Sequence, residues 1–460
     1  MLKFHLITDT HYYAYEKLGF SDHMDQVTVN ESGAIIDAVI DKLLAETDTD
    51  LVLLAGDLCT GGDRANHEGL LPKLRRLKDG GKRVFALTAS HDYFRMDHRE
   101  DGDEGPRSDM VYREELSALY WDFGRVDAAA RYEPDPLSYV AQLASGYRLL
   151  CLNTDGSGSH EALYDWAEAE VRRALAEGQF IFAMHHYPVL APSPVYPLLA
   201  PDALDNGAGI RERLADAGLR FVFTGHTHMQ NISCMTTPAG NRLYDINTGA
   251  AVGYNAPIRT VTIHGGEMTV TTGSIDSFAW DLQGKCVSQY LSDSFDRMLN
   301  SIFEAANADI ARMLDILNGE FRVDKAALLK YKPLLSLAGK FLYRLTFGGA
   351  GTLLGCRRKI PKTVRNVRVK DFIMEVVRNI YGGDEAYSAD TPQGAATFAV
   401  MGRLEKLARS FLKNADLPFD SLQRFVMSLL YDGGLPDNNA VLPLENDAAA
   451  PLKSGQNKGG

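Results

Sequence analysis

The first part of the chain, up to about residue 275, alternates short apolar runs with helical patterns, and this alternation constrains the fold more than any other feature. The clearest helical pattern places Ile36, Val39, Ile40 and Leu43 on one face. The expected strands are Phe4–Ile7, Leu51–Leu54, Val84–Leu87, Phe180–Met184 and Phe221–Phe223. A strand–helix–strand order of this kind predicts a layered α/β domain.

A polar block follows each of these runs and carries carboxylate or imidazole side chains. The blocks are Asp9-Thr10-His11, Gly56-Asp57, Ser90-His91-Asp92, His185-His186 and Gly225-His226-Thr227-His228. Because an open α/β sheet binds its ligands beyond the carboxyl ends of its strands, we expect the blocks to meet at one edge. Carboxylates and imidazoles hold hard-to-borderline divalent cations. The sequence therefore predicts metal-dependent hydrolysis, with a phosphoester as the favoured substrate.

The spacing within the blocks supports a shared metal site. Asp9 and His11 lie two residues apart after a strand, and His226 and His228 repeat that spacing. The missing side chain of the glycine before Asp57 lets the backbone and a metal approach closely. A carboxylate has two oxygens, so Asp57 is the natural ligand for two cations to share.

Taken in order, the blocks resemble the calcineurin-like metallophosphoesterase family, whose pattern is D-x-H, G-D, G-N-H-[DE], H and G-H-x-H. The matching segments of this sequence are LITDTHY, LAGDL, TASHDY, MHHYP and FTGHTH. INTGAAVGYNAPIRTVTI, after the last block, is similar to the closing strand region of the family. The resemblance implies an α/β fold, a four-layer β-sandwich flanked by helices, with two metals about 3.5–4 Å apart.

Carried over by position, the resemblance implies two ligand sets that share one carboxylate. One metal would be held by Asp9, His11, Asp57 and His228, and the other by Asp57, Ser90, His185 and His226. His91 would be the catalytic histidine, and Asp92 would orient it. His186 could contact the substrate or pack behind the site, and both interpretations stay open. The cations would be Mn, Fe, Zn or Co, since oxygen and nitrogen ligands suit all four.

One departure from the family pattern concerns the second metal. The family's Asn is Ser90 here, and the Gly before it is Ala89. An amide oxygen reaches further than a hydroxyl and is the better neutral donor to a cation. We therefore expect weaker occupancy of the second metal, with Ser90 binding weakly, through water, or not at all.

The implied reaction is phosphoester hydrolysis by a hydroxide that bridges the two cations. The D-x-H and GDL blocks, a helix start at His67-Glu68 and an added helical domain are most similar to the bacterial cyclic-nucleotide phosphodiesterase branch. A small phosphodiester, with a cyclic nucleotide as the best single guess, is the favoured substrate. The alternatives are a phosphomonoesterase acting on nucleotides or small phosphates, and a catalytically weakened metal-binding interaction protein, which Ser90 alone supports.

The character of the chain changes after about residue 285, where helical patterns replace strand patterns. Leu291, Phe295, Met298 and Leu299 begin this series. We expect a catalytic domain over residues 1–280 and an all-helical C-terminal domain over residues 285–433. The remaining residues, 434–460, are rich in Asn, Pro, Ala and Gly, so this tail is expected to be disordered.

Composition limits the partners and the compartment. The formal net charge of −12 argues against broad nucleic-acid binding, although bound cations can still attract a small anionic substrate. Five scattered cysteines indicate reduced thiols rather than a disulfide framework. The chain enters a strand at once, with no room for a signal peptide, and no apolar run reaches membrane-spanning length. A cytoplasmic protein without a membrane partner is expected, and a homodimer stays open.

Overall fold

The structure, a computed structural model, describes residues 1–21, 26–94, 108–154, 160–196, 209–321, 343–411 and 421–445, together with residues 329, 332, 336 and 339. The chain forms two compact units. The first comprises Met1–Pro192, Asp202–Phe295 and Leu435–Gly460, and the second comprises Ser193–Pro201 and Asp296–Gly434. The polypeptide therefore enters the second unit twice, briefly at Ser193–Pro201 and then over Asp296–Gly434, and returns to the first unit each time.

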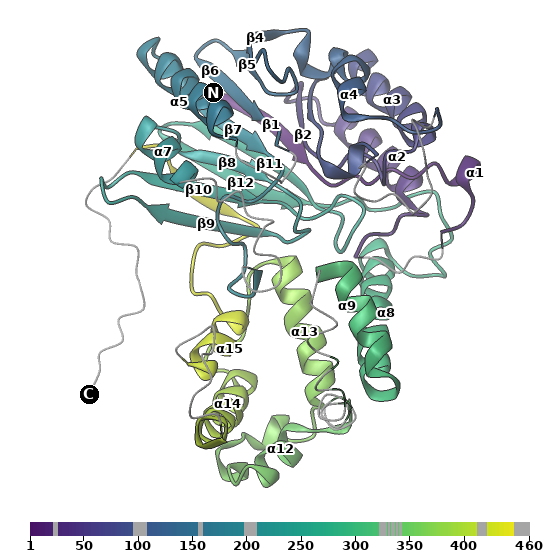
Figure 1. Ribbon diagram of the computed structural model, residues 1–460, viewed down its shortest axis with the longest axis vertical. Helices are drawn as coiled ribbons and strands as arrows, with labels where there is room; N and C mark the ends of the chain where they lie inside the picture. Colours follow the sequence, from purple (N-terminus) through teal and green to yellow (C-terminus); the bar gives the residue numbers. More distant parts are fainter. Residues whose placement is uncertain are drawn as a thin grey trace. The chain divides into compact units, whose positions relative to one another are not determined.

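One sheet of the first unit runs in the order β13-β12-β11-β1-β2-β3 (Figure 1). Its strands are β1 (Leu2–Ile7), β2 (Leu51–Ala55), β3 (Arg83–Leu87), β11 (Ile258–His264), β12 (Glu267–Gly273) and β13 (Ala440–Pro443). β1, β2 and β3 are parallel neighbours, whereas β11, β12 and β13 extend the sheet in antiparallel fashion. The parallel strands bring their carboxyl ends to the same edge.

The second sheet runs in the order β4-β5-β6-β7-β8-β10-β9. Its strands are β4 (Ala128–Arg131), β5 (Tyr139–Ala144), β6 (Tyr147–Leu152), β7 (Phe180–His185), β8 (Phe221–Thr224), β9 (Asn231–Thr236) and β10 (Arg242–Asn247). β6, β7, β8 and β10 are parallel, so this sheet also gathers several carboxyl ends at one edge.

The two sheets pack face to face through large apolar side chains. The ring of Phe4 on β1 stacks on Phe182 of β7 with the centroids 5.3 Å apart. The ring of Phe223 on β8 meets the Phe4 ring edge-on, with the centroids 5.4 Å apart. These residues belong to a buried cluster that includes side chains of both sheets, such as Phe85 and Ile246. The cluster joins the sheets into a sandwich, because each strand turns alternate side chains inward.

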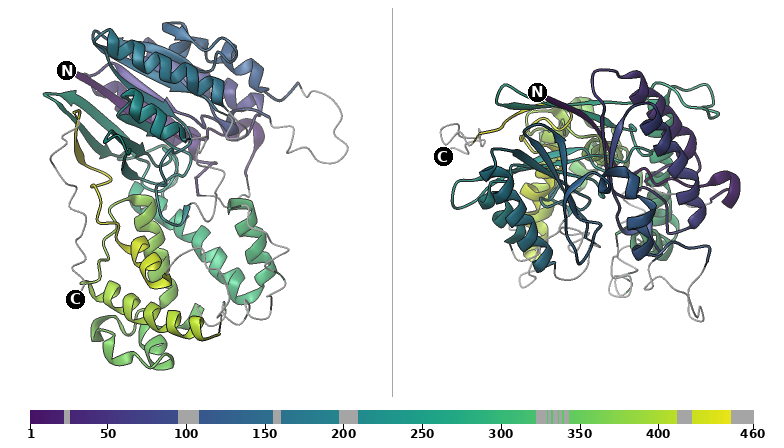
Figure 2. Two further views of the ribbon diagram at one scale, coloured as in Figure 1. Left: turned by 60° about the vertical axis from the view of Figure 1, so that its left-hand side comes forward. Right: turned by 90° about the horizontal axis from the view of Figure 1, so that it is seen from above.

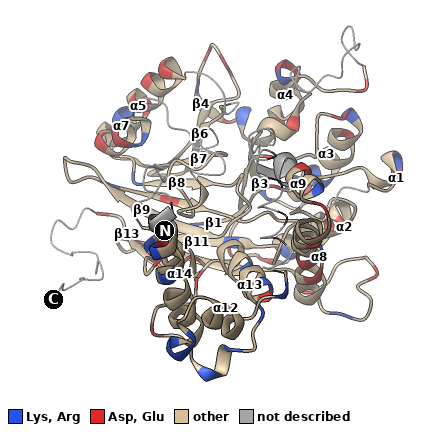
Figure 3. Cartoon of the chain, turned by 60° about the horizontal axis from the view of Figure 1, so that its bottom comes forward, with Lys and Arg blue, Asp and Glu red and all other residues tan. Residues whose placement is uncertain are grey.

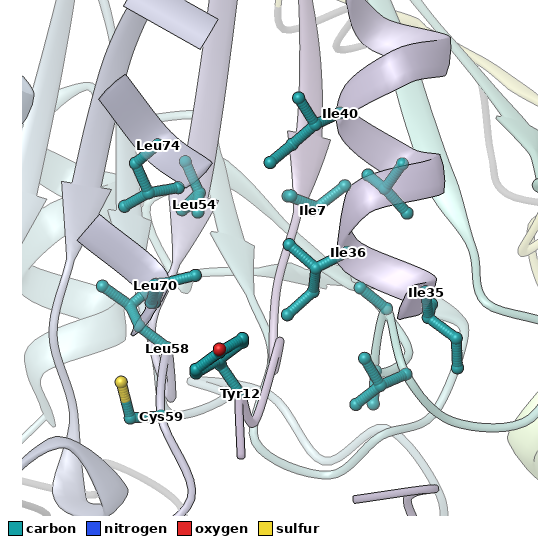
Figure 4. Packing of buried hydrophobic residues seen from close by; sticks show 14 of the residues in the cluster. Ile7, Tyr12, Ile35, Ile36, Ile40, Leu54, Leu58, Cys59, Leu70 and Leu74 are labelled. Atoms are coloured by element: carbon teal, nitrogen blue, oxygen red, sulfur yellow. The ribbon is translucent and has the colours of Figure 1, made fainter. Parts of the chain in front are cut away.

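Helices cover the outer face of the first sheet. α2 (Ser32–Ala45) and α3 (Arg64–Asp79) carry apolar stripes toward β1 and β2. Figure 4 shows Ile36 and Ile40 of α2 beside Ile7 of β1 in this layer. Ile36 and Ile40 share one face of α2, as their four-residue spacing predicts.

Two further helices cover the outer face of the second sheet. They are α5 (Glu161–Ala176) and α7 (Ile210–Ala217), which lie on the opposite side of the sandwich from α2 and α3 (Figure 2). Leu163 of α5 and Leu214 of α7 belong to the same buried cluster as Leu150 of β6. In Figure 3 the acidic and basic residues of α5 and α7 stand out against the mostly tan strands. The expected four-layer α/β sandwich, with all five expected strands, is confirmed.

The C-terminal residues correct one expectation, that residues 434–460 form a disordered tail. Ala440–Pro443 form β13, which pairs with β12 as the edge strand of the first sheet. Ala440 and Leu442 are buried in the sandwich, whereas Val441 between them is exposed. Burial of every second side chain against the core explains why this segment forms a strand instead of a disordered tail. Residues 446–460 of the expected tail lie outside the described residues.

The second unit is helical in the part that the structure describes. α8 (Val287–Ala308) begins in the first unit and is followed by α9 (Ile310–Phe321), α12 (Phe347–Leu353), α13 (Val369–Gly382), α14 (Pro392–Phe411) and α15 (Leu422–Leu430). Arg378 of α13 pairs with Asp296 of α8 at 2.5 Å. The helical C-terminal portion is thus confirmed. None of the described helices combines the length and the apolar character needed to cross a bilayer.

Candidate metal centre

The loops after β1 and β2 run side by side and place the first two polar blocks together. The backbone N–H of Asp9 donates to the carbonyl of Gly56 at 3.0 Å, and that of His11 donates to the carbonyl of Asp57 at 3.0 Å. Because the strands are parallel neighbours, their ends continue the pairing for several residues. The first two blocks therefore meet at one sheet edge, as the sequence predicts.

Asp9, His11 and His228 form one group of metal donors, with one donor atom of each within 4.8 Å of the others. The Nε2 atoms of His11 and His228 face each other at 3.1 Å. Asp9 Oδ1 lies 3.4 Å from the Nε2 atom of His228 and 3.8 Å from that of His11. This triangle of one carboxylate and two imidazoles fits a divalent cation.

Asp57, His186 and His226 form the second group, again within 4.8 Å. His186 Nε2 lies 2.9 Å from Asp57 Oδ2 and 3.9 Å from Asp9 Oδ1. The rings of His186 and His226 meet edge-on with centroids 5.2 Å apart. His186 therefore lies close to carboxylates of both groups, and the second group is also a carboxylate with two imidazoles.

The histidine pair after β7 differs from the sequence prediction, which assigned the ligand position to His185. The His185 ring instead contacts the Thr154 hydroxyl, 3.1 Å from Nε2, and the Tyr187 carbonyl, 2.5 Å from Nδ1. Nδ1 of His186 lies 2.9 Å from the Ala55 carbonyl, which turns its Nε2 toward Asp57. Adjacent residues at a strand end point to opposite sides, so one histidine of the pair enters the donor group.

The carboxylate of Asp9 also connects the two sheets. It accepts the backbone N–H of His226 at 3.0 Å and the hydroxyl of Thr8 at 2.7 Å. β1 and β8 belong to different sheets, so this contact joins the two sheets at the edge where the donor groups lie.

Backbone strain gathers at the same residues. Nine non-glycine residues of the described ranges have positive φ, and five of these are Asp9, His11, Asp57, His226 and His228. Their φ angles lie between 35° and 67°, in the left-handed region that side chains disfavour. Strain of this kind costs on the order of 1–3 kcal/mol per residue and persists where the surrounding structure enforces it.

Two glycines make room for the donors. Gly56 has a φ of 100°, and a Cβ there would lie 2.5 Å from Nδ1 of His186. A Cβ on Gly225 would clash with Thr8 and with the carboxylate of Asp9. The G-D and G-H-x-H blocks therefore need glycine for close packing of the donor side chains.

The electrostatics favour the protonation states that metal ligands need. Burial disfavours the charged form of Asp57, but His186 and His91 outweigh it and hold its pKa well below the usual range. Burial lowers the pKa of His11 and of His226 to about 3. Ionised carboxylates and neutral imidazoles are the forms that bind divalent cations.

His186 behaves differently from its neighbours. Burial disfavours its charged form, yet the carboxylates of Asp57 and Asp9 outweigh this cost and raise its pKa to about 9. An imidazolium between two buried carboxylates supplies the positive charge that a cation would otherwise bring.

His91 and Ser90 lie in a short 3-10 turn, Ser90–Asp92, directly after β3. The backbone N–H of His91 donates to Asp57 Oδ1 at 3.0 Å, and its ring meets the ring of His11 edge-on at 5.0 Å. The His91 side chain is exposed, whereas Ser90 is half-buried. His91 is thus both beside the donor groups and open to a substrate.

Asp92 is predicted to orient His91, and the contacts of its side chain are with the backbone on either side. Its carboxylate is fully buried and accepts the backbone N–H groups of Cys59 at 2.8 Å and Ala89 at 2.7 Å. Those contacts tie the turn that carries His91 to the segment that follows Asp57. The role that the geometry gives Asp92 is to fix two backbone segments.

Two buried polar residues of β10 were not predicted from the sequence. Asp245 accepts the N–H groups of Val189 and Leu190, after the histidine pair, and the hydroxyl of Thr224, before Gly225. Asn247 donates to the carbonyl of Gly225 at 2.7 Å. The sequence could have indicated them, because residues 245 and 247 lie two apart on one strand and therefore share a face. That strand ends at the edge where the donor groups lie.

Comparison with known proteins identifies the part of the chain that builds this centre. Residues 2–230 match the family model described as calcineurin-like phosphoesterase. A comparison with curated protein sequences finds no match.

Several solved structures are similar to the chain at low identity. A dimetal phosphatase from Danio rerio has 13 % identity and a TM-score of 0.43, over 59 % of this chain and 95 % of that one. NAD nucleotidase from Haemophilus influenzae has 13 % identity and a TM-score of 0.33, over 71 % and 60 %. The 5'-nucleotidase precursor from Thermus thermophilus has 15 % identity and a TM-score of 0.31, over 67 % and 60 %. These scores are too low to carry a functional argument.

Proposed function

The chain belongs to the calcineurin-like phosphoesterase family, and we propose that this metal-dependent phosphoesterase cleaves small phosphodiesters, with a cyclic nucleotide as the favoured substrate. The observation that carries the proposal is the pair of donor groups at one edge of the sandwich, each with one buried carboxylate and two imidazoles. Two such groups side by side suit the two-cation hydrolysis of phosphoesters.

The ligand assignment follows from the donor groups. Asp9, His11 and His228 hold the first divalent cation. His186 and His226 hold the second, with Ser90 as a weak fourth ligand. Asp57 faces His186 with one oxygen, and we assign it as the carboxylate that both cations share. Mn, Fe, Zn and Co all suit these oxygen and nitrogen ligands.

The chemistry divides between the cations and the chain. When bound, two divalent cations lower the pKa of a water between them and polarise the phosphoester. The chain keeps its carboxylates ionised and His11 and His226 neutral, so that their lone pairs remain available. His91, exposed beside His11, donates a hydrogen bond to the phosphate or to the leaving oxygen.

The preference for a diester rests on the similarity of the D-x-H and GDL blocks and the added helical portion to the cyclic-nucleotide branch of the family. A phosphomonoesterase is the competing activity within the same chemistry. Ser90 favours a third possibility, a metal-binding protein with weakened catalysis, because a hydroxyl replaces the stronger amide donor. One pair of model substrates, a diester and a monoester, separates these three functions.

The test compares bis(p-nitrophenyl) phosphate with p-nitrophenyl phosphate, using purified protein and added Mn²⁺. We expect faster hydrolysis of the diester and loss of turnover in His91→Ala. A faster monoester reaction would replace the diesterase proposal with the monoesterase. If neither substrate is cleaved while metal is demonstrably bound, the impaired-site function is the correct one.

A further inference from the structure

The C-terminal segment of the first unit reaches the loop that carries His226 and His228. Before β13, Asp437 is buried, and its carboxylate accepts the backbone N–H of Ile232 at 2.8 Å. Ile232 is the second residue of β9, which begins three residues after His228. The contact holds the start of β9 in place beside the donor groups.

Arg259 of β11 joins this segment to β10. Its side chain is fully buried and donates from Nη1 to the carbonyl of Asp437 at 2.8 Å. Nη2 donates to the carbonyl of Asn247 at 2.6 Å, and Nε donates to the hydroxyl of Thr248 at 3.0 Å. A guanidinium suits this position, because its rigid fork donates in several directions at once and stays charged.

Asn247 in turn holds the histidine loop on both sides of His226. Its Nδ2 donates to the carbonyl of Gly225 at 2.7 Å, and its Oδ1 accepts the hydroxyl of Thr227 at 2.6 Å. Arg259 and Asn247 therefore form a continuous chain of hydrogen bonds from Asp437 to the residues that flank His226.

A second branch runs through Gln230, two residues after His228. Its Nε2 donates to Oδ1 of Asn438 at 3.2 Å, and its Oε1 accepts the N–H of Gly249 at 3.0 Å. Gln230 is buried, so both ends of its amide are satisfied within the protein. The C-terminal segment thus also contacts Gln230, just after the histidine loop.

We infer that residues 435–443 and Arg259 position the His226–His228 loop for metal binding, so that the metal centre is incomplete without the C-terminal segment. The inference rests on the proposed function in so far as that loop binds the cations. Arg259 acts through Asn247 and is a positioning residue. The segment acts through Asp437 and Asn438.

The physical reason is the left-handed backbone of the loop. His226 has a φ of 67° and His228 a φ of 58°, conformations that persist only while the surroundings enforce them. Without residues 435–443, Nη1 of Arg259 would lose the Asp437 carbonyl, and the N–H of Ile232 would lose its carboxylate acceptor. The loop would then relax toward unstrained angles and separate the imidazoles from Asp9 and Asp57.

Two shortened chains test the role of the segment. One ends after Gly434 and lacks it, and the matched control ends after Glu445 and keeps it. We expect the control to bind metal like the full chain and the shorter protein to bind it about 10–100-fold more weakly. That is the usual loss of metal affinity when a contact that supports a metal ligand is removed. A synthetic peptide of residues 435–445 should restore the affinity. A folded chain ending at Gly434 with unchanged affinity would overturn the inference.

Arg259→Lys is the second test, since it is independent of whether the shorter chain folds. A lysine cannot reach all of the acceptors, so we expect weaker metal binding, a fall in kcat larger than any rise in KM, and faster amide hydrogen exchange at 225–229 in the metal-free protein. The matched control is Arg83→Lys on β3 of the same sheet, where the arginine donates to the carbonyls of Gln142 and Leu143.

The outcomes separate the inference from the proposed function. A lower melting temperature in Arg259→Lys with unchanged metal affinity and unchanged exchange at 225–229 would make the arginine a purely structural residue and end the inference. If the full chain binds two metals but hydrolyses no phosphoester, the proposed function fails, and the metal affinities of the variants still decide the inference.

Discussion

His186 Nε2 lies 2.9 Å from Asp57 Oδ2, and both side chains are buried. The neighbouring His185 turns the other way, toward Thr154 and Tyr187. Two adjacent imidazoles of the same strand end thus have separate environments, and only the second belongs to a donor group.

The histidine pair offers a matched comparison. His186→Ala removes a donor of the second group, so we expect loss of one bound metal and a fall in kcat/KM of roughly 100-fold or more, the scale of a lost group in a metal-assisted reaction. His185→Ala should keep the full metal content. Metal analysis of both proteins checks this, and a loss of metal in His185→Ala alone would reverse the assignment.

Ser90→Asn tests the departure from the family pattern. The amide oxygen reaches further than the hydroxyl, so the variant should fill its second metal site at a lower metal concentration than the wild type. Calorimetric titration of the two metal-free proteins with Mn²⁺ measures the difference in affinity at the second site. Equal and full loading of both proteins with two metals would show that Ser90 does not weaken the site.

Substitutions of Asp57 and of His91 should differ in their effects on metal content and on turnover. Asp57→Asn is expected to lose both metal content and turnover, because one oxygen of the carboxylate faces His186 and the other holds the His91 turn. His91→Ala should retain both metals while kcat falls about 100-fold or more, as for a lost general acid. Asp48→Asn, at an exposed carboxylate, is the control with unchanged values.

Asp245 predicts a pH-dependent stability. Burial raises its pKa to about 6, even though the Thr224 hydroxyl and the Leu190 amide favour the ionised form. The folded state then holds a proton that the unfolded chain has released, so this group's contribution to stability is complete below about pH 4 and is lost as the pH rises through 6.

Asp245→Asn removes that titration. The difference in free energy of unfolding between the variant and the wild type should move in the variant's favour by about 2 kcal/mol between pH 4 and pH 7. Urea unfolding of the metal-free proteins across this range measures it. A difference that stays constant with pH would contradict the raised pKa.

The sandwich and most of its site were predictable because the relevant signals are local. Buried strands read as apolar runs, and parallel strands end at a common edge. Choosing between His185 and His186 was possible in principle. Phe182 and Met184 face the core between the sheets, and a period of two continues that face to His186.

The remaining features depend on partners that are distant in sequence. β13 is a short apolar run within a segment rich in Asn and Pro, and its strand character comes from pairing with β12. Arg259 becomes a positioning residue only because Asp437 and Asn247 place their carbonyls around it. No local pattern reveals such contacts, since they form only when the chain has closed.

The late position of β13 sets an order of events during synthesis. β12 ends at Gly273, and the strand that completes its edge begins at Ala440. At ~5–20 residues per second, the ribosome spends on the order of 10–30 s between the two strands. For that interval the nascent sandwich has an open edge and Arg259 lacks its Asp437 acceptor, so on our inference the centre reaches its full metal affinity only after the whole helical unit has been made.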